Sequence, residues 1–405
     1  MIKTIEFKTY KSYKDWQKLE LKPLTILFGK NSSGKSALAR LPTLFEESLK
    51  GNFPEPIQFN NNGVEIGAEF RDLVYGRREA EVLEFILKTD IKAMSVNIAA
   101  NIGSNNTPKI IKWKLDNEFD LSYNDINKSY LNEINQEEYI CEFNGFRLDL
   151  INYKNKDGSE TLPDLSNFSL KTSYFGPFRE IPQRSYTISQ FKETDSFGVK
   201  GENSYLYLIK DYQTKEKVLI KKVSDWFKNN FEGWGIEVQK DLQQPNYYIE
   251  LSKDNPKMNI NITNVGEGMS QILPLVVRAY FKADKPTTII MEQPELHLHP
   301  GAHGNLAELF VNSLSDDKNK RYLIETHSQN FILRIRRLIA ECKFNKEDLA
   351  LYWIDFDEEK NISAMKKIKV NELGKVDYWP ENIFSESLDE SIALRTAQIL
   401  RNNGN

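Results

Sequence analysis

The sequence predicts an α/β fold whose centre is a mostly parallel β-sheet with helices packed against it. Residues 24–28 read as a buried strand that is followed by a Gly/Ser-rich turn and the start of a helix. Two later apolar runs, residues 287–291 and 321–325, read as further buried strands that end in polar, ionisable residues. Strands that alternate with helices pair in parallel and place functional side chains at their carboxyl ends, so these segments define the predicted sheet.

The composition is that of a large globular chain with a substantial core. The 405 residues are 40% hydrophobic, which predicts one large domain with an insertion, or two domains. The net charge of −4 argues against a generally basic nucleic-acid surface but leaves a local basic groove open. Cys141 and Cys342 fit no metal or disulfide pattern, and residues 1–6 are not a signal peptide. Because no apolar run is long enough to span a membrane, we expect a cytoplasmic protein without membrane association.

The turn after the first buried strand carries the most specific motif. Residues 29–36, Gly-Lys-Asn-Ser-Ser-Gly-Lys-Ser, match the phosphate-loop pattern G-x-x-x-x-G-K-[ST] between a strand and a helix. Glycines allow the backbone N–H groups of such a loop to turn inward, and the helix dipole that follows favours an anion. An ordinary Gly/Ser turn is the alternative. We predict that the loop binds ATP through Gly29, Asn31, Ser32, Ser33, Gly34, Lys35 and Ser36, and that Ser36 also ligates Mg²⁺.

The first half of the chain is predicted to contain strands at its start and a β-rich insertion after the first helix. That helix is expected to reach about residue 49, where a stretch with Gly and Pro ends it. The following region shows short segments of strand-like alternation and one stretch of helical spacing. The predicted strands are residues 2–8, 19–28, 64–70, 93–99, 110–115 and 139–153, and the predicted helix is residues 78–88.

The second half returns to strands and helices around the predicted sheet. The expected elements are strands at 170–175, 236–239, 247–251 and 258–262, helices within 201–231 and at 271–281, a closing hairpin of 349–355 with 363–370, and an amphipathic stretch at 388–400. We divide the chain into a discontinuous head of residues 1–49 and 170–370, a β-rich insertion of residues 50–169 and a C-terminal tail of residues 371–405. Arg179, just after a strand end, is expected to face a nucleotide or a partner, with an ordinary surface arginine as the alternative.

The strand at 287–291 ends in an acid downstream of the phosphate loop, which is the Walker B arrangement. The acid of such a strand holds Mg²⁺ on the β- and γ-phosphate oxygens, directly or through water. Glu292 occupies that position, and we predict it to be a catalytic residue and a metal ligand.

The order of these motifs resembles the ABC-type ATPase head. A Gly-rich turn at 264–271 precedes the Walker B strand, and Thr-His-Ser follows the next strand at 326–328. The string Tyr-Lys-Ser-Tyr at 10–13 and the run from Glu292 to Pro300 are similar to those of the prokaryotic AAA-named ATPases of the RecF, chromosome-maintenance and overcoming-lysogenization-defect type. Residues 174–179 and 377–384 resemble a branch with an uncharacterised C-terminal domain after the ATPase core. The resemblance implies an ABC-like P-loop NTPase head with a β-rich insertion and a helical lobe.

The resemblance also implies roles for further residues. In such heads ATP lies between two subunits, and the Gly-rich turn of one subunit faces the phosphate loop of the other. Gly266 and Gly268 would then approach the γ-phosphate of the partner through backbone N–H groups. His327 matches the switch histidine, which contacts the γ-phosphate, while Lys11 and Ser12 match positions near the adenine and ribose.

Two positions depart from the family pattern. Gly266 stands where the signature serine is expected, so that bond is either absent or made by Ser270. Gln293 stands where a glutamate usually orients the attacking water. An amide can position water but cannot take its proton, which leaves Glu295 as the alternative general base. We therefore expect slow hydrolysis, or a head that acts mainly as a nucleotide-gated clamp.

The histidines and the basic clusters each have a simpler interpretation. His297, His299 and His303 lie close in sequence, but a metal site needs a complete ligand set, and we favour a role in the loop after Walker B. His327 could instead be a mere neighbour of a helix cap. Basic clusters at 334–337 and 366–369 are more often solvated faces than DNA contacts.

The function expected from the sequence is that of a cytosolic ATPase that forms a homodimer or a higher homo-oligomer around ATP and Mg²⁺. Its output would be a conformational change passed to an effector protein encoded nearby, with a role in phage defence expected from the resemblance alone. A RecF-like ATPase that acts directly on nucleic acid in repair or maintenance is the alternative. The ATP-binding subunit of a transporter is a weaker one, because the insertion and the unusual signature argue against it. Long coiled-coil arms are excluded because the chain has no heptad run.

Overall fold

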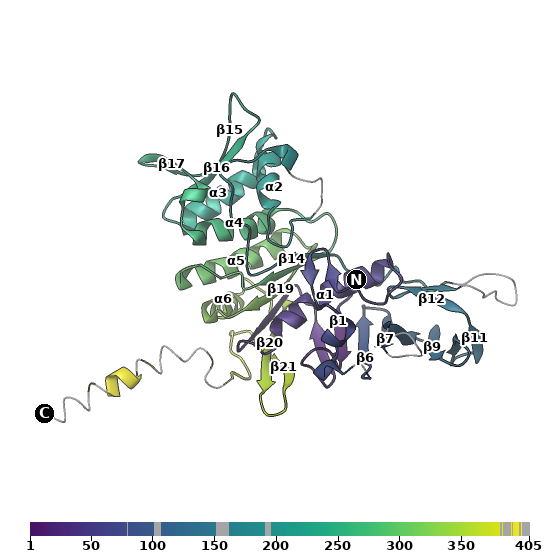
Figure 1. Cartoon of the computed structure of the whole chain (residues 1–405). Helices are drawn as coiled ribbons and strands as arrows, with labels where there is room; N and C mark the ends of the chain where they lie inside the picture. The colour runs from purple at the N-terminus through teal and green to yellow at the C-terminus, as the bar shows by residue number, and fades with distance from the viewer. Residues whose placement is uncertain are drawn as a thin grey trace.

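The computed structural model is a mixed α/β fold built on two large sheets (Figure 1). It describes residues 1–78, 80–100, 107–150, 162–190, 196–380, 383, 390, 392–396 and 398. A six-stranded sheet has the order β14-β18-β19-β3-β20-β21, and an eight-stranded sheet has the order β11-β10-β9-β8-β7-β6-β1-β2. No described helix is long and apolar enough to cross a membrane.

The six-stranded sheet is parallel except at β21, which closes a hairpin with β20. Its strands are β3 (Leu24–Gly29), β14 (Thr172–Phe175), β18 (Thr287–Glu292), β19 (Lys320–Thr326), β20 (Leu349–Asp357) and β21 (Ile362–Ile368). Every residue of β18 and β19 is buried, as expected for strands covered on both faces. The predicted α/β fold and its parallel sheet are therefore confirmed.

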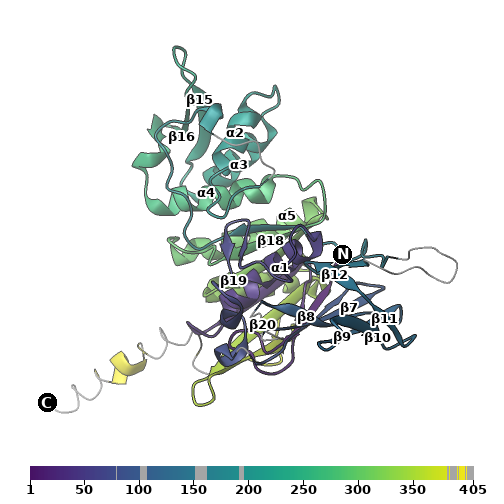
Figure 2. The same ribbon diagram turned by 45° about the vertical axis from the view of Figure 1, so that its right-hand side comes forward.

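Helices cover both faces of this sheet, and successive residues of β3 show how the faces divide. Ile26 packs with the helices α4 (Glu267–Tyr280), α5 (Pro300–Asp316) and α6 (Gln329–Ala340). Leu27 points to the opposite side, into the core that contains α1 (Lys35–Lys50). The alternation follows from the two-residue repeat of a strand. As a result, α1 lies between the six-stranded sheet and the second sheet (Figure 2).

The eight-stranded sheet is antiparallel throughout. Its strands are β1 (Thr4–Lys8), β2 (Gln17–Glu20), β6 (Leu83–Lys88), β7 (Ala93–Ala99), β8 (Lys109–Leu115), β9 (Phe119–Asn124), β10 (Ser129–Asn132) and β11 (Glu137–Tyr139). β1 pairs with β2 on one side and with β6 on the other, so the first two strands of the chain share a sheet with those of the predicted insertion. Phe85 of β6 packs edge-on against Phe45 of α1, with ring centroids 4.9 Å apart.

A short hairpin links the insertion to the C-terminal end of α1. The hairpin consists of β12 (Cys141–Asn144) and β13 (Arg147–Leu150). The Phe146 amide donates to the Ser48 carbonyl at 2.7 Å. A Cβ on Gly145 would lie 2.1 Å from the same carbonyl oxygen, so only glycine permits this approach. A two-stranded ribbon, β4 (Asn60–Asn61) with β5 (Val64–Glu65), lies between α1 and β6 in the chain.

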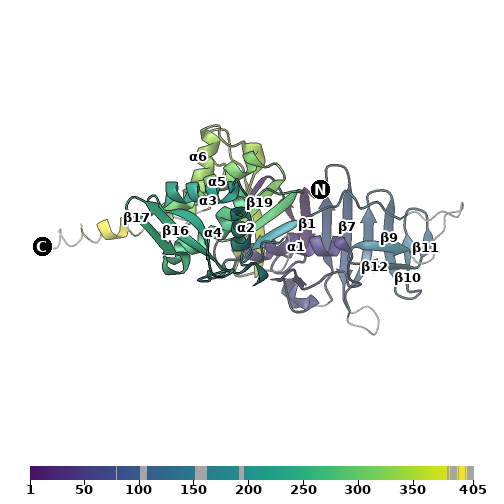
Figure 3. The same cartoon turned by 90° about the horizontal axis from the view of Figure 1, so that it is seen from above.

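The remaining elements form a helical lobe on the far side of the six-stranded sheet. They are α2 (Ser204–Tyr212), α3 (Val218–Asn230) and a three-stranded sheet of β15 (Gly235–Lys240), β16 (Tyr247–Asp254) and β17 (Lys257–Asn261). α4 joins this lobe to the main sheet, because its buried side packs with both. Seen from above, the lobe and the eight-stranded sheet lie at opposite ends of the molecule (Figure 3).

Several predicted elements differ from the structure. The helix predicted at 78–88 is wrong: residues 83–88 form strand β6, in which Leu83, Phe85 and Leu87 alternate inward. The strand predicted at 19–28 is two strands separated near Pro23, and 139–153 divides into β11 and the β12–β13 hairpin, with residues 151–153 outside the described part. Only residues 64–65 of the strand predicted at 64–70 form a strand, while β9, β10 and α5 were not predicted. Six of the thirteen residues of the stretch 388–400 lie outside the described residues.

Candidate functional site

The phosphate loop connects β3 directly to α1. Gly34, which precedes the first helical residue, has φ of 98°, a region that favours glycine. A Cβ at Gly34 would lie 2.8 Å from Ser12 Oγ and 2.9 Å from Tyr13 OH, and one at Gly29 would lie 2.3 Å from the Ile354 carbonyl. Both glycines of the motif are therefore required by the close approach of neighbouring segments as well as by the path of the loop.

Ser12 supports this loop from behind. The Ser363 hydroxyl donates to the Ser33 carbonyl at 2.8 Å and lies 2.7 Å from Ser12 Oγ, while Tyr13 OH donates to the Gly34 carbonyl at 3.1 Å. Lys11 has a positive φ of 55°, and its ammonium donates to the Ile66 carbonyl. The predicted contacts of Ser12 with ribose and of Lys11 with adenine stay predictions.

Lys35 lies inside the loop rather than in solvent. Its ammonium donates to the carbonyls of Gly29 at 3.1 Å and Lys30 at 2.6 Å, and the residue is 3% exposed. Burial lowers the pKa of Lys35, and the nearby Glu325 carboxylate raises it again. The Lys35 ammonium is thus held inside the loop by two backbone carbonyls, and the phosphate oxygens of a nucleotide would take the place of these acceptors.

Glu292, the predicted Walker B acid, is held by two side chains that the sequence did not indicate. The Arg40 guanidinium of α1 donates hydrogen bonds to both carboxylate oxygens, from Nε to Oε1 at 2.7 Å and from Nη2 to Oε2 at 2.9 Å. Tyr174 of β14 donates its hydroxyl to Oε1 at 2.7 Å. Glu292 is only 2% exposed, so this fork compensates a buried charge. These three bonds leave one acceptor position on Oε2, which is the position that Glu292 could offer to Mg²⁺ directly.

A second carboxylate, Glu325, lies beside Glu292 and was missed. The two residues are paired in register on the neighbouring strands β18 and β19. Burial raises the pKa of Glu325 to about 7; repulsion by Glu292 adds to this, and the Ser36 hydroxyl and the Lys35 ammonium oppose it. The predicted strand at 321–325 already ended in this acid, so its position beside the Walker B strand was the signal that could have found it.

The oxygen atoms gathered here fit a divalent cation. Ser36 and Glu325 lie close together, and Glu325 Oε2 is buried without a hydrogen-bond partner among the described residues. Mg²⁺ prefers such hard oxygen ligands and would relieve the repulsion between the two carboxylates. Ser36 and Glu325 are therefore the residues best placed to hold Mg²⁺, with Glu292 behind them.

Glu295 and His327 connect the turns that follow β18 and β19. Glu295 Oε1 accepts the backbone N–H of His327 at 2.7 Å, and the residue is 7% exposed. Burial raises the pKa of Glu295. Burial together with Lys35 lowers the pKa of His327 to about 4, so its imidazole is neutral near pH 7. Gln293 adopts a positive φ of 46° and is bonded through its backbone to the Glu325 carbonyl at 2.8 Å.

The expectation that Arg179 faces a nucleotide or a partner is wrong in this structure. Arg179 is 4% exposed, and its guanidinium donates to the carbonyls of Glu292 at 3.2 Å, Gln293 at 2.9 Å and Pro177 at 3.0 Å. Burial lowers the pKa of Arg179 to about 10. The side chain fixes the backbone of the Walker B turn, because its five donors suit the carbonyls exposed there.

The Gly-rich turn begins α4 at some remove from the phosphate loop of the same chain. Gly266 is exposed, and a Cβ placed on it would have nothing within 4 Å. A Cβ on Gly268, by contrast, would lie 2.8 Å from the His297 carbonyl. The Ser270 hydroxyl donates to the Glu267 carbonyl at 3.0 Å and the residue is 4% exposed, so Ser270 is not presented at the surface as a substitute for the signature serine.

The three histidines of the loop after Walker B have separate partners. His297 Nδ1 lies 3.5 Å from Glu267 Oε2, and His299 Nδ1 accepts the Gly301 amide at 3.2 Å as a helix N-cap. His303 bridges Ser328 Oγ at 2.7 Å and the Leu298 carbonyl at 3.2 Å. Within the described part of the chain, no group of three or more His, Cys, Asp or Glu side chains could hold a metal ion.

A phosphate loop between a buried strand and a helix, with carboxylates at the ends of the neighbouring parallel strands, defines a P-loop NTPase. Residues 1–332 match the family described as the AAA ATPase domain, and the chain belongs to that family. Membership together with the intact loop assigns the chain to the ATPases.

The chain is also similar to a curated protein and to solved structures. It is 25% identical over 362 residues to an "ATP/GTP phosphatase" of Helicobacter pylori (strain ATCC 700392 / 26695), which covers 85% of this chain and 90% of the relative. An SMC head bound to the C-winged helix domain of ScpA aligns with a TM-score of 0.49 at 12% identity, over 91% of this chain and 98% of that one. The SMC head domain from Thermotoga maritima aligns with a TM-score of 0.44 at 11% identity, over 91% and 99% of the two chains.

Proposed function

We propose that the chain binds ATP·Mg²⁺ between two copies of itself, arranged head to tail, and that binding and slow hydrolysis switch a partner protein. The observation that carries the proposal is that two elements predicted to contact the phosphates, the phosphate loop and the Gly-rich turn, belong to different parts of the same chain. Lys35 lies in the loop at the edge of the main sheet, whereas the N-terminus of α4 at Gly266 is open to solvent. A second copy would bring that N-terminus, with its free N–H groups and dipole, to the γ-phosphate.

The geometry supports slow turnover. Gln293 can orient water but cannot accept its proton. Glu295 is buried: its Oε1 accepts the His327 amide, and its Oε2 has no hydrogen-bond partner among the described residues, so Oε2 is the atom that can accept a proton. The neutral imidazole of His327 lies on the same side as Lys35 and suits a hydrogen bond to phosphate or water rather than an ion pair.

A partner protein is a better candidate for the output than DNA. Half of the six cations in the basic clusters are paired with carboxylates of the described residues: Arg334 with Glu308, Arg337 with Glu341 at 3.2 Å and Lys367 with Glu20 at 2.7 Å. Cations neutralised in this way contribute little to phosphate binding. The identity of the partner as a nearby-encoded effector, and a role in antiviral defence, rest on the family resemblance.

The test is the molecular mass of the full chain by multi-angle light scattering with ATP·Mg²⁺ and with ADP. The wild type should double in mass with ATP·Mg²⁺ only. Gly266→Asp should keep ATP binding but stay at the starting mass, because the new carboxylate repels the γ-phosphate of the partner. Gly266 is preferred to Gly268, where a side chain would clash within its own chain.

Asn229→Asp on α3 is the matched control, since it adds the same charge to an exposed site of the lobe and should assemble normally. A wild type whose mass ignores ATP·Mg²⁺, or a Gly266→Asp variant that assembles like the wild type, would exclude the head-to-tail dimer.

A further inference from the structure

A large cavity lies beside the outer strand of the main sheet, away from the phosphate loop. Its volume is about 750 Å³, within the range of small-molecule sites. α1, β14, residues 196–199 and the C-terminal end of α4 enclose it, and its lining includes Thr43, Tyr174, Phe197, Tyr207, Arg278 and Phe281.

The side chain of Arg278 is the feature that points to a ligand. Arg278 is 3% exposed and lines the cavity, and it forms no ion pair with a carboxylate of the described residues. Its hydrogen bonds are long, from Nε to Ser173 Oγ at 3.3 Å and from Nη1 to the Phe281 carbonyl at 3.4 Å. A guanidinium carries five N–H donors, so most of its capacity is unused at a buried position.

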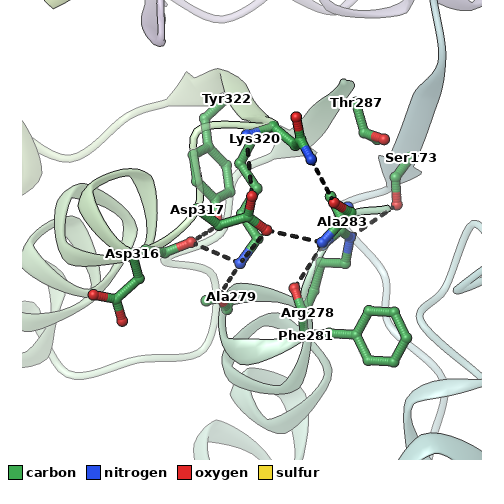
Figure 4. A network of polar contacts seen from close by, with 12 residues as sticks. Ser173, Arg278, Ala279, Phe281, Ala283, Thr287, Asp316, Asp317, Lys320 and Tyr322 are labelled. Atoms are coloured by element: carbon green, nitrogen blue, oxygen red, sulfur yellow. Dashed lines mark hydrogen bonds and ion pairs between the residues drawn. The ribbon is translucent and has the colours of Figure 1, made fainter. Parts of the chain in front are cut away.

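Figure 4 shows why the acid nearby does not neutralise this arginine. Asp317 Oδ2 accepts the Ala283 amide at 2.8 Å and lies 3.7 Å from the ammonium of Lys320. Lys320 itself is fully engaged, because it also donates to the Ala279 carbonyl at 2.6 Å and to Ser313 Oγ at 3.3 Å. The two buried cations are thus unequal: Lys320 has a carboxylate partner and Arg278 has none in the described chain.

The rest of the cavity offers an apolar surface and further polar groups. Phe197, Tyr207 and Phe281 pack together, with ring centroids 4.5–5.2 Å apart, and the Arg278 guanidinium lies over Phe197 at 5.1 Å. Lys171 and Lys282 are exposed at the cavity, as is Asp284.

Two buried polar residues complete the lining. Glu46 is satisfied, because its Oε2 accepts the Thr172 amide at 2.8 Å and its Oε1 pairs with Lys50 at 3.0 Å. Asn61 is 1% exposed, and its Oδ1 has no hydrogen-bond partner in the described chain. The cavity is therefore lined by a buried cation without a carboxylate partner and by a buried acceptor without a donor among the described residues.

The shape of the cavity favours a small molecule over an added peptide strand. Strand addition needs a row of free backbone groups along a sheet edge. The outer edge of β14 is already closed at both ends, by Glu46 at the Thr172 amide and by the Val199 carbonyl at the Gly176 amide, each at 2.8 Å.

We propose that this cavity binds a small organic anion, with its carboxylate or phosphate group on Arg278 and a flat apolar part against Phe197, Tyr207 and Phe281. The desolvated guanidinium supplies charge-assisted bonds to the anion, and the aromatic wall supplies area. The proposal does not rest on ATP binding, so its test is separate from that of the proposed function.

The experiment measures binding of benzoate and of benzamide to the full chain without nucleotide, by calorimetry or ligand-observed NMR. The two probes share shape but differ in charge, and phenyl phosphate distinguishes a phosphate from a carboxylate preference. Benzoate or phenyl phosphate should bind more tightly than benzamide. Arg278→Met keeps the chain length but removes the charge, and should weaken binding of the anion about tenfold or more.

Two controls make the result decisive. Lys35→Ala should bind benzoate like the wild type, which excludes adventitious binding in the phosphate loop. If Arg278→Met does not fold, Lys282→Gln at the exposed rim replaces it and should weaken benzoate binding at low ionic strength, whereas Lys240→Gln on exposed β15 should not. Equal affinity for benzoate, phenyl phosphate and benzamide, or benzoate binding unchanged in the folded cavity variant, would overturn the proposal.

Discussion

Replacing Arg40 with methionine should destabilise the fold, because it leaves the Glu292 carboxylate buried without a countercharge. Glu292 is 2% exposed, and Arg40 binds both of its oxygens, at 2.7 and 2.9 Å. Breaking a buried ion pair by removing one partner costs about 3–5 kcal/mol. The Arg40 side chain is 33% exposed and the Tyr174 bond remains, so we expect the low end, a loss of about 3 kcal/mol in the free energy of unfolding.

A double-mutant cycle separates this effect from lost packing. Glu292→Gln alone should cost only about 1 kcal/mol, since the remaining Arg40 can reach water. Arg40→Met with Glu292→Gln should be more stable than Arg40→Met alone, with a coupling energy of about 2 kcal/mol. Urea unfolding followed by circular dichroism near pH 7 gives all four values.

Lys50→Met provides a control on the same helix. Lys50 is 41% exposed and pairs with Glu47 at 2.6 Å and with Glu46 at 3.0 Å; Glu46 keeps the Thr172 amide as a partner, so the loss of Lys50 should cost no more than about 1 kcal/mol. If Arg40→Met costs as little as Lys50→Met, or if the double variant loses the sum of the two single losses, the fork does not compensate a buried charge.

Three further outcomes follow from the site and the core. Lys35→Ala should abolish ATP·Mg²⁺ binding in a titration of the folded protein, because it removes the loop's only inward cation among the described residues; unchanged affinity would place the nucleotide elsewhere. Gln293→Glu should raise ATP turnover and Glu295→Gln should lower it, and a rapid wild-type rate that Glu295→Gln leaves unchanged would contradict both roles. Burial lowers the pKa of Lys320 from 10.5 to about 8, so the folded state binds fewer protons than the unfolded state between these values and stability rises with pH there. The rise should total about 3 kcal/mol and be absent from Lys320→Met in urea unfolding near pH 7 and near pH 10; an equal rise in both proteins would show that Lys320 does not titrate in this window.

The parts of the site that lie within one strand–turn–helix could be read from the sequence. The phosphate loop, the Walker B strand and the boundaries of α1 are local patterns in which spacing alone determines the prediction. Glu292 was found for the same reason. The strand at 83–88 was read as a helix because the apolar Ile86 stands at an outward position and hides the two-residue alternation that the partner strands β1 and β7 impose.

The partners of the site residues could not be found in that way. Arg40, Tyr174 and Glu325 come from a helix and two strands that are far apart in the chain, and only the order of the sheet brings them to Glu292. Arg179 was expected at a ligand because it follows a strand end, but the folded chain uses it to fix a backbone turn. A charged residue near a strand end therefore indicates the edge of the sheet, while the direction of its side chain depends on non-local packing.

The contact between Gly145 and Ser48 has a consequence for how the two ends of the molecule communicate. Helix α1 has 16 residues, which corresponds to a length of about 24 Å from the phosphate loop to the β12–β13 hairpin. The hairpin has no slack against this helix, since its backbone already touches and hydrogen-bonds the Ser48 carbonyl. Pro42 lies between the two ends of α1 and removes one of its backbone hydrogen bonds, so a displacement of the first turn by phosphate would have to pass this point to reach the hairpin. The β12–β13 hairpin, which forms a sheet of its own, would then be the first part of the insertion to move with nucleotide binding.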